Sequence, residues 1–145
     1  MLFRSGIELY RGKPIYHGLG NYVCVTRALA VSGNDSPERK AWAERRQKLF
    51  GFAPDPLMPT YPFHPDSRHT VIARCVVNAQ AEVEAGFIPC WIDGEARPVP
   101  LGRDARGEAM LDYMRVITQA AGLRVRYEWQ DDWVRVLPEA PGAHA

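Results

Sequence analysis

The chain has 145 residues, of which 46% are hydrophobic and 24% charged, and its formal net charge is +1. These proportions are typical of a globular protein with a single core and exclude a chain that is disordered throughout. Arginine is spread along the sequence, so no basic stripe exists to neutralise phosphates, and we expect no nucleic-acid partner. No run approaches the roughly 18 apolar residues of a membrane span, and the first residues lack the basic and apolar regions of a signal peptide.

The first predicted element is a hairpin close to the N-terminus. Residues 7–10 alternate between apolar and polar, residues 11–14 have turn chemistry, and residues 15–25 are apolar apart from a Gly18-Leu19-Gly20-Asn21 interruption. Glycine tolerates positive φ, and asparagine does so better than most residues. The interruption therefore predicts either a bulge or strand-ending turn, or a backbone that approaches a ligand closely.

A helix is predicted from Ser36 to about Phe50, with Ser36 as its N-cap, Pro37 at its first position and Gly51 as its stop. Its apolar side is thin, and the rest is dominated by basic residues: Arg39, Lys40, Arg45, Arg46 and Lys48. We expect a solvated surface helix. The alternative is a cationic face that attracts an anionic polymer.

Residues 54–67 contain five prolines and are predicted to be an extended loop. A long ordered loop often borders a functional site, so this segment is a candidate lid or wall. A static connection is the equal alternative.

Residues 70–78 and 83–92 predict a second hairpin that turns near residues 79–81. Pro89 has no N–H to donate, so it is expected at an edge position or a bulge. Residues 98–102 are predicted to be a loop.

The last part of the chain predicts a helix over 105–121 and a final hairpin around Asp131-Asp132. Apolar residues at helical spacing indicate that the helix faces the core, with Gly122 as its stop. Adjacent carboxylates in a turn point apart, so the turn interpretation is preferred over an acid–base pair. The predicted fold is α/β: a mostly antiparallel sheet of about six strands with two helices on one face.

The cysteines and histidines do not have metal-site spacing. Cys24, Cys75 and Cys90 each lie in an apolar run, without a Cys-x-x-Cys pair, and are expected to be buried free thiols. The four histidines are scattered, so no metal site within this chain is expected. His17 is interpreted as a hydrogen-bonded core or edge histidine, or as a substrate contact beside the Gly-Asn turn.

Two stretches carry a family resemblance. Residues 6–22 resemble a segment of the CapA, or poly-γ-glutamate capsule biosynthesis, family that runs Gly-x-Glu-x-Tyr-Arg/Lys-Gly-Lys-Pro-Ile-Phe-Tyr-Ser-Leu-Gly-Asn-Phe. Here Tyr16-His17-Gly18 stands in place of Phe-Tyr-Ser, and Tyr22 in place of the last Phe. Residues 87–92, followed by Arg97-Pro98, resemble the family's later apolar-Ile-Pro strand and its Arg-Pro.

The resemblance implies a metallophosphoesterase-like sandwich, of which residues 6–138 would be the C-terminal part. We expect residues 1–5 to be an artefactual lead-in, the alternative being an ordinary short N-terminus, and residues 139–145 to be a disordered tail. The metal-binding N-terminal half of the domain would be missing. Divalent metal ions would then belong to the full-length parent, which the resemblance places at the membrane or in the cell envelope, and this chain would be soluble and inactive alone.

The implied function is a metal-dependent hydrolase or transferase step in the synthesis of an anionic polymer, either poly-γ-glutamate or a capsule glycan. His17, Gly18, Gly20 and Asn21 would form part of the cleft wall. Two alternatives stay open: a non-enzymatic binding or assembly module of a capsule-synthesis complex, and a stand-alone small domain of another role.

Overall fold

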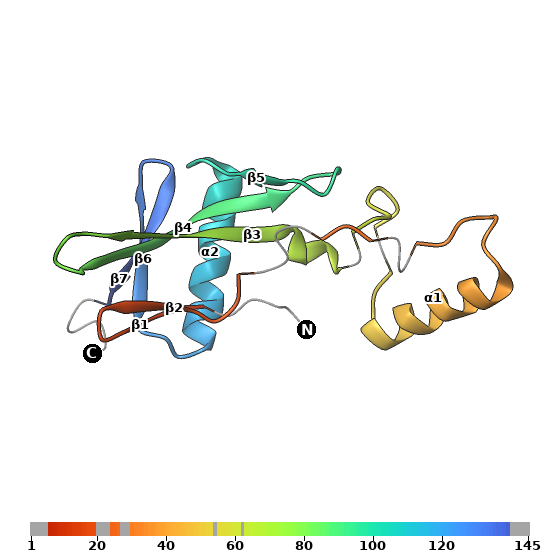
Figure 1. Cartoon of the computed structure of the whole chain (residues 1–145), viewed down its shortest axis with the longest axis horizontal. Helices are drawn as coiled ribbons and strands as arrows, with labels where there is room; N and C mark the ends of the chain where they lie inside the picture. The colour runs from red at the N-terminus through yellow and green to blue at the C-terminus, as the bar shows by residue number, and fades with distance from the viewer. Residues whose placement is uncertain (1–5, 20–23, 27–29, 54, 62, 140–145) are drawn as a thin grey trace.

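The computed structural model describes residues 6–19, 24–26, 30–53, 55–61 and 63–139. The protein is mixed α/β, with two α-helices and mostly antiparallel strands, as the sequence predicts (Figure 1). In chain order the elements of the described residues are β1 (Ile7–Tyr10), β2 (Lys13–Tyr16), α1 (Pro37–Phe50), the 3-10 helix η1 (Pro65–Arg68), β3 (His69–Val77), β4 (Val83–Ile92), β5 (Pro98–Pro100), α2 (Ala105–Ala120), β6 (Val125–Gln130) and β7 (Trp133–Pro138).

The main sheet has the order β3-β4-β7-β6, and β5 pairs with the end of β4. Its longest pairing is the predicted β3–β4 hairpin, whose register runs from His69 opposite Trp91 to Val77 opposite Val83. Asn78 closes the turn, because its Oδ1 accepts hydrogen bonds from the amides of Gln80 at 3.0 Å and Glu82 at 2.9 Å.

Pro89 is not at an edge as expected, since β4 has partners on both sides. β7 pairs with β4 only at Gly86 and Phe87, and β5 pairs only with residues 90–92. Pro89 lies between these two pairings, and its carbonyl accepts from Leu101 N at 2.8 Å. In an antiparallel strand, the N–H and C=O of a residue point to the same side, so the missing N–H of Pro89 lies on the side of Leu101, where only one hydrogen bond joins the two residues. Residues 98–100, expected to be loop, form the strand β5.

Helix α2 covers one face of the main sheet (Figure 1). It begins at Asp104, whose carboxylate accepts from the amides of Arg106 and Gly107, and it is followed by Gly122 at φ +68°. The core between helix and sheet is formed by buried side chains from both: Met110, Leu111 and Met114 with Val71, Phe87, Tyr127, Val134 and Val136. Full burial of one such aliphatic or aromatic side chain stabilises the fold by about 1.5–3 kcal/mol.

Helix α1 does not pack on the sheet and stands apart from it (Figure 1), so the expectation of two helices on one face is wrong. The predicted caps are confirmed: Ser36 Oγ accepts from Arg39 N at 3.3 Å, and Gly51 has φ +76°. Among its described side chains only Ala43 is buried, because the few apolar residues form no continuous stripe. Neither described helix combines the length and apolar character needed to cross a membrane.

The predicted β1–β2 hairpin is confirmed and forms a separate two-stranded sheet. Its turn places Arg11 at φ 50° and Gly12 at φ 74°, as primed hairpin turns require. Ile7 joins the core, and Tyr16 Oη donates to Gly86 O at 2.7 Å. The hairpin is therefore attached to β4 through a side chain rather than through a backbone ladder.

The proline-rich loop contributes a small core of its own. Met58 and Tyr61 are buried against Ile92 and Ala96. Residues 65–67, expected to be extended, instead belong to η1. The buried contacts favour the interpretation of this loop as a static connection.

Candidate ligand-contact site

The predicted cleft-wall residues lie partly outside the described chain: Gly20 and Asn21 fall outside it, whereas His17 and Gly18 are described. His17 Nε2 is 3.0 Å from Glu8 Oε2, and their side chains are 40% and 34% exposed, so His17 is an edge histidine of the hairpin. Gly18 is half-buried. The carbonyl of Leu19 then accepts a 3.2 Å hydrogen bond from Thr70 Oγ1, which brings this segment to the beginning of β3.

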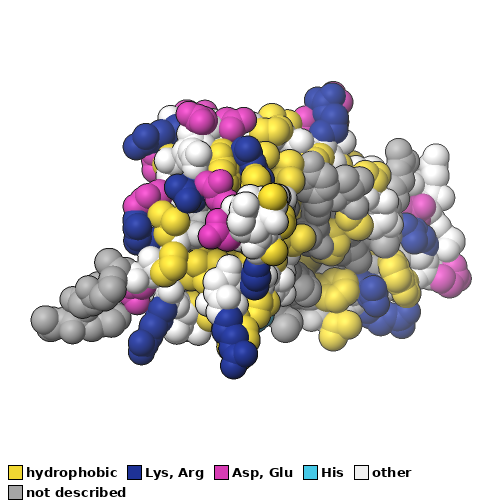
Figure 2. Space-filling view, turned by 60° about the vertical axis from the view of Figure 1, so that its left-hand side comes forward, with side chains coloured by type: hydrophobic (Ala, Val, Ile, Leu, Met, Phe, Trp, Pro, Cys, Tyr) yellow, Lys and Arg dark blue, Asp and Glu magenta, His cyan; other side chains and the backbone are white. Residues whose placement is uncertain are grey.

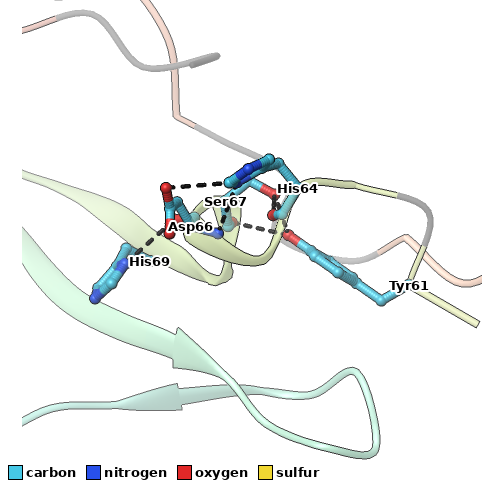
Figure 3. Close-up of polar contacts among 5 residues, drawn as sticks. All are labelled: Tyr61, His64, Asp66, Ser67 and His69. Atoms are coloured by element: carbon cyan, nitrogen blue, oxygen red, sulfur yellow. Dashed lines mark hydrogen bonds and ion pairs between the residues drawn. The ribbon is translucent and has the colours of Figure 1, made fainter. Parts of the chain in front are cut away.

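The turn that precedes β3 is closed by its own polar side chains (Figure 3). His64 Nδ1 accepts from Asp66 N at 3.2 Å, and Ser67 Oγ donates to His64 O at 2.6 Å. Tyr61 Oη lies 2.8 Å from Ser67 O and 2.9 Å from Ser67 Oγ. His69 Nδ1 is 3.2 Å from the carbonyl of Asp66.

These residues do not form a catalytic triad, although serine, histidine and aspartate occur together. A nucleophilic serine needs a histidine nitrogen within hydrogen-bonding reach of its Oγ. Here the described contact of Ser67 Oγ with His64 is to the backbone carbonyl, while His64 Nδ1 faces the amide and carboxylate of Asp66. Ser67 is also only 6% exposed. The turn is structural, and it fixes the positions of Arg68 and His69.

A cluster of aromatic and basic side chains lies beside this turn. Arg68 Cζ is 4.4 Å and Arg106 Cζ 5.2 Å from the centre of the Trp91 ring. The ring of His69 is 4.6 Å from Trp91 and 6.2 Å from Tyr113. We call these five residues the Trp91 cluster. They come from η1, β3, β4 and α2.

The two guanidinium groups of the Trp91 cluster are only partly neutralised. Both lie near one ring, so their central carbons are within about 10 Å of each other. Arg68 donates from Nε to Ile92 O at 2.8 Å, and its carboxylate partner Asp55 is 3.9 Å away. Arg106 is exposed and belongs to no ion pair within the described part of the chain. Such a pair of guanidinium groups can bind a carboxylate or a phosphate.

Sequence reasoning missed this cluster. The register of β3 and β4 brings His69 opposite Trp91, and the packing of α2 brings Arg106 to the same ring. The only sequence signal was the Arg68-His69 pair just before the strand predicted over residues 70–78, and such a pair has no specificity of its own.

No group of three or more His, Cys, Asp or Glu side chains that could hold a metal ion occurs among the described residues.

All three cysteines are free, but only Cys90 is buried; Cys24 is half-buried and Cys75 exposed, so the expectation of three buried thiols is wrong. Cys75 lies in the exposed C-terminal part of β3, and its Sγ is 3.6 Å from Tyr16 Oη. Burial raises the pKa of Tyr16. Asp131 is at φ 53°, consistent with the turn interpretation.

The face of the molecule in Figure 2 carries charged side chains of both signs. On the face in Figure 2, Lys and Arg side chains are interspersed with Asp and Glu. This distribution suits a local anion contact better than a long electrostatic track. Comparisons of the sequence with protein-family models and with curated proteins found no match.

Proposed function

We propose that this chain contributes the polymer-contacting part of a CapA-like, metallophosphoesterase-like protein, and that the Trp91 cluster binds an anionic polymer such as poly-γ-glutamate. The observation that carries the proposal is the presence of two guanidinium groups on one indole ring, one of them exposed and in no ion pair among the described residues. Poly-γ-glutamate presents one carboxylate per residue, and planar guanidinium groups bind carboxylates in a bidentate manner.

The position of the two stretches that resemble the CapA family supports the choice of polymer. Residues 6–22 include β1 and β2, and residues 87–92 belong to β4. These stretches are far apart in the sequence, yet Tyr16 Oη reaches the carbonyl of Gly86, one residue before the second stretch. If both stretches belong to one pattern shared with the CapA family, we expect the segments that carry them to pack together.

The proposal assigns binding, and no chemical step, to the described residues. Metal-assisted hydrolysis needs a set of imidazole and carboxylate ligands, and the described residues do not offer such a group. We therefore expect no phosphodiesterase turnover by the purified chain with added Mn²⁺. Any divalent metal ion in the parent protein would be held by other residues.

Titration of the purified chain with short γ-linked glutamate oligomers tests the binding function. Arg106→Gln removes one exposed charge from the Trp91 cluster, and Arg45→Gln removes one exposed charge from α1 as a matched control. We expect Arg106→Gln to weaken binding about two- to fivefold, the range for one exposed ion pair, and Arg45→Gln to leave it unchanged. The proposal fails if the wild-type chain does not bind or if the two variants weaken binding equally.

A stand-alone small binding domain is the second candidate. One observation favours it: α2 and the main sheet share a contiguous buried core formed wholly within this chain. A cooperative urea transition of a monomeric protein would support this candidate. Aggregation through the exposed edges of the β1–β2 sheet would support the view that the chain needs a partner layer.

A further inference from the structure

A hollow of about 650 Å³ lies between the C-terminal end of α2 and β6, at the opposite end of the helix from Arg106. Its size falls within the range of about 300–1,000 Å³ that is usual for small-molecule sites. The lining residues include arginines, the hydroxyl-bearing Thr118 and Tyr127, and the apolar Leu123 and Val125. Neither Arg68 nor Trp91 lines it, so an inference about this pocket is independent of the proposed polymer contact.

Two residues that line the pocket, Thr118 and Tyr127, have buried hydroxyl groups. Thr118 is 2% and Tyr127 5% exposed, and their oxygens are 2.6 Å apart. Ile7 N donates to Tyr127 Oη at 3.4 Å, so that oxygen is an acceptor for the backbone of β1. Burial raises the pKa of Tyr127, and its hydroxyl group therefore keeps its hydrogen at neutral pH.

The hydroxyl groups of Thr118 and Tyr127 have two hydrogens, and the hydrogen bond between them uses only one. Each hydroxyl group carries a single hydrogen. If Thr118 donates to Tyr127, the hydrogen of Tyr127 needs an acceptor; if Tyr127 donates to Thr118, the hydrogen of Thr118 needs one. The described residues supply no such acceptor in either case. A buried donor without an acceptor costs about 1–3 kcal/mol, which a ligand oxygen would recover.

The rim of the pocket is cationic. Three arginines and one glutamate carry the charges of the lining residues: Arg115, Arg124, Arg126 and Glu139. Arg115 is paired with Asp112 at 2.7 Å, and Arg126 is paired with Glu128. Arg124 is exposed and forms no ion pair within the described ranges. The lining therefore has an excess of positive charge, and the guanidinium group of Arg124 has no ion pair among the described residues.

We propose that this pocket binds a small carboxylate. One carboxylate oxygen accepts the spare hydrogen of the Thr118–Tyr127 pair, Arg124 pairs with the negative charge, and an apolar body lies against Leu123 and Val125. A neutral amide of the same shape lacks the charge and binds more weakly.

Phenylacetate and its neutral analogue phenylacetamide are suitable probes, and ¹H–¹⁵N correlation spectra of the full chain are the measurement. For a ligand of this size we expect an affinity on the order of millimolar. Phenylacetate should shift the amide signals of Ile7, Gly122 and Val125 in a saturable manner, and phenylacetamide should do so at least about fivefold more weakly.

Two variants locate the site. Arg124→Gln should weaken phenylacetate binding about two- to fivefold, while Arg45→Gln on α1, which removes an equal charge, should leave it unchanged. Thr118→Val tests the hydroxyl pair and, if its spectrum shows a folded protein, should also weaken binding; if it does not fold, Arg124→Gln decides alone. The proposal is overturned if no signal saturates, if the shifts map to the Trp91 cluster or α1, or if phenylacetamide binds as well as phenylacetate.

Discussion

The close packing of β4 against β7 at Gly86 leads to a sharp prediction for Gly86→Ala. A Cβ atom at this position would overlap the carbonyl oxygen of Val134 and would lie 2.6 Å from Cε3 of Trp133. Carbon atoms pack at about 3.5–4.0 Å, so the ring would have to move by roughly 1 Å. Trp133 is 2% exposed and Val134 O belongs to the backbone, so neither can move without separating the strands.

The cost of that separation can be bounded. Overpacking in a core costs about 1–3 kcal/mol, and each net hydrogen bond that is lost adds about 1 kcal/mol. The β4–β7 pairing consists of only two register pairs, Gly86 with Arg135 and Phe87 with Val134. We therefore expect a loss of at least about 3 kcal/mol, equivalent to a decrease in Tm of roughly 10 °C.

Urea unfolding followed by circular dichroism measures this loss, and Gly94→Ala is the control. A Cβ at Gly94 meets no atom within 4 Å, so this variant should be neutral or slightly more stable, by up to about 1 kcal/mol. The reasoning is refuted if Gly86→Ala unfolds within about 1 kcal/mol of the wild type, which would mean that the strands are farther apart than described.

Two further predictions concern a buried thiol and the helix caps. Burial raises the pKa of the Cys90 thiol from 9.0 to about 11. The unfolded chain therefore loses this proton at a lower pH than the folded protein, and the free energy of unfolding should fall as pH rises from 9 to 11. In urea titrations Cys90→Ala should reduce this fall, and an equal fall in the variant would contradict the assignment of the pH dependence to Cys90. Ser36→Ala should lower the helical circular dichroism without moving the main unfolding midpoint, because α1 does not pack on the sheet. Asp104→Ala should instead lower the free energy of unfolding by about 1 kcal/mol, because α2 is packed on the sheet. A shift of the main midpoint by Ser36→Ala would show that α1 is coupled to the core.

The elements of this protein could be predicted where their signals are local. Ser36, Pro37 and Gly51 delimit α1 because caps act on the backbone within a few residues. A β-branched run over residues 70–78 and an alternating run over 83–92, with a turn near residues 79–81, likewise predict the β3–β4 hairpin. The expected edge position of Pro89 was wrong because β7, a partner distant in the chain, and β5 cover the side of β4 opposite β3.

The candidate sites could not be predicted in the same way. The Trp91 cluster needs the register that places His69 opposite Trp91 and the packing of α2 that adds Arg106. The carboxylate pocket needs Thr118 of α2 and Tyr127 of β6 to meet in the core. The predicted wall at His17 was a local inference from the Gly-Asn turn, and its contribution to a cleft stays a prediction.

The sequence by itself determined the mixed α/β class, both caps of α1, the glycine that follows α2 and the hairpins, because propensity, capping and turn chemistry act between near neighbours. Only the tertiary structure decided that α2 covers the sheet while α1 stands apart, which thiol is buried, and which arginines meet an indole or line a pocket. Those outcomes depend on strand register and on the burial of side chains from distant segments, and both are set by the packing of the whole core.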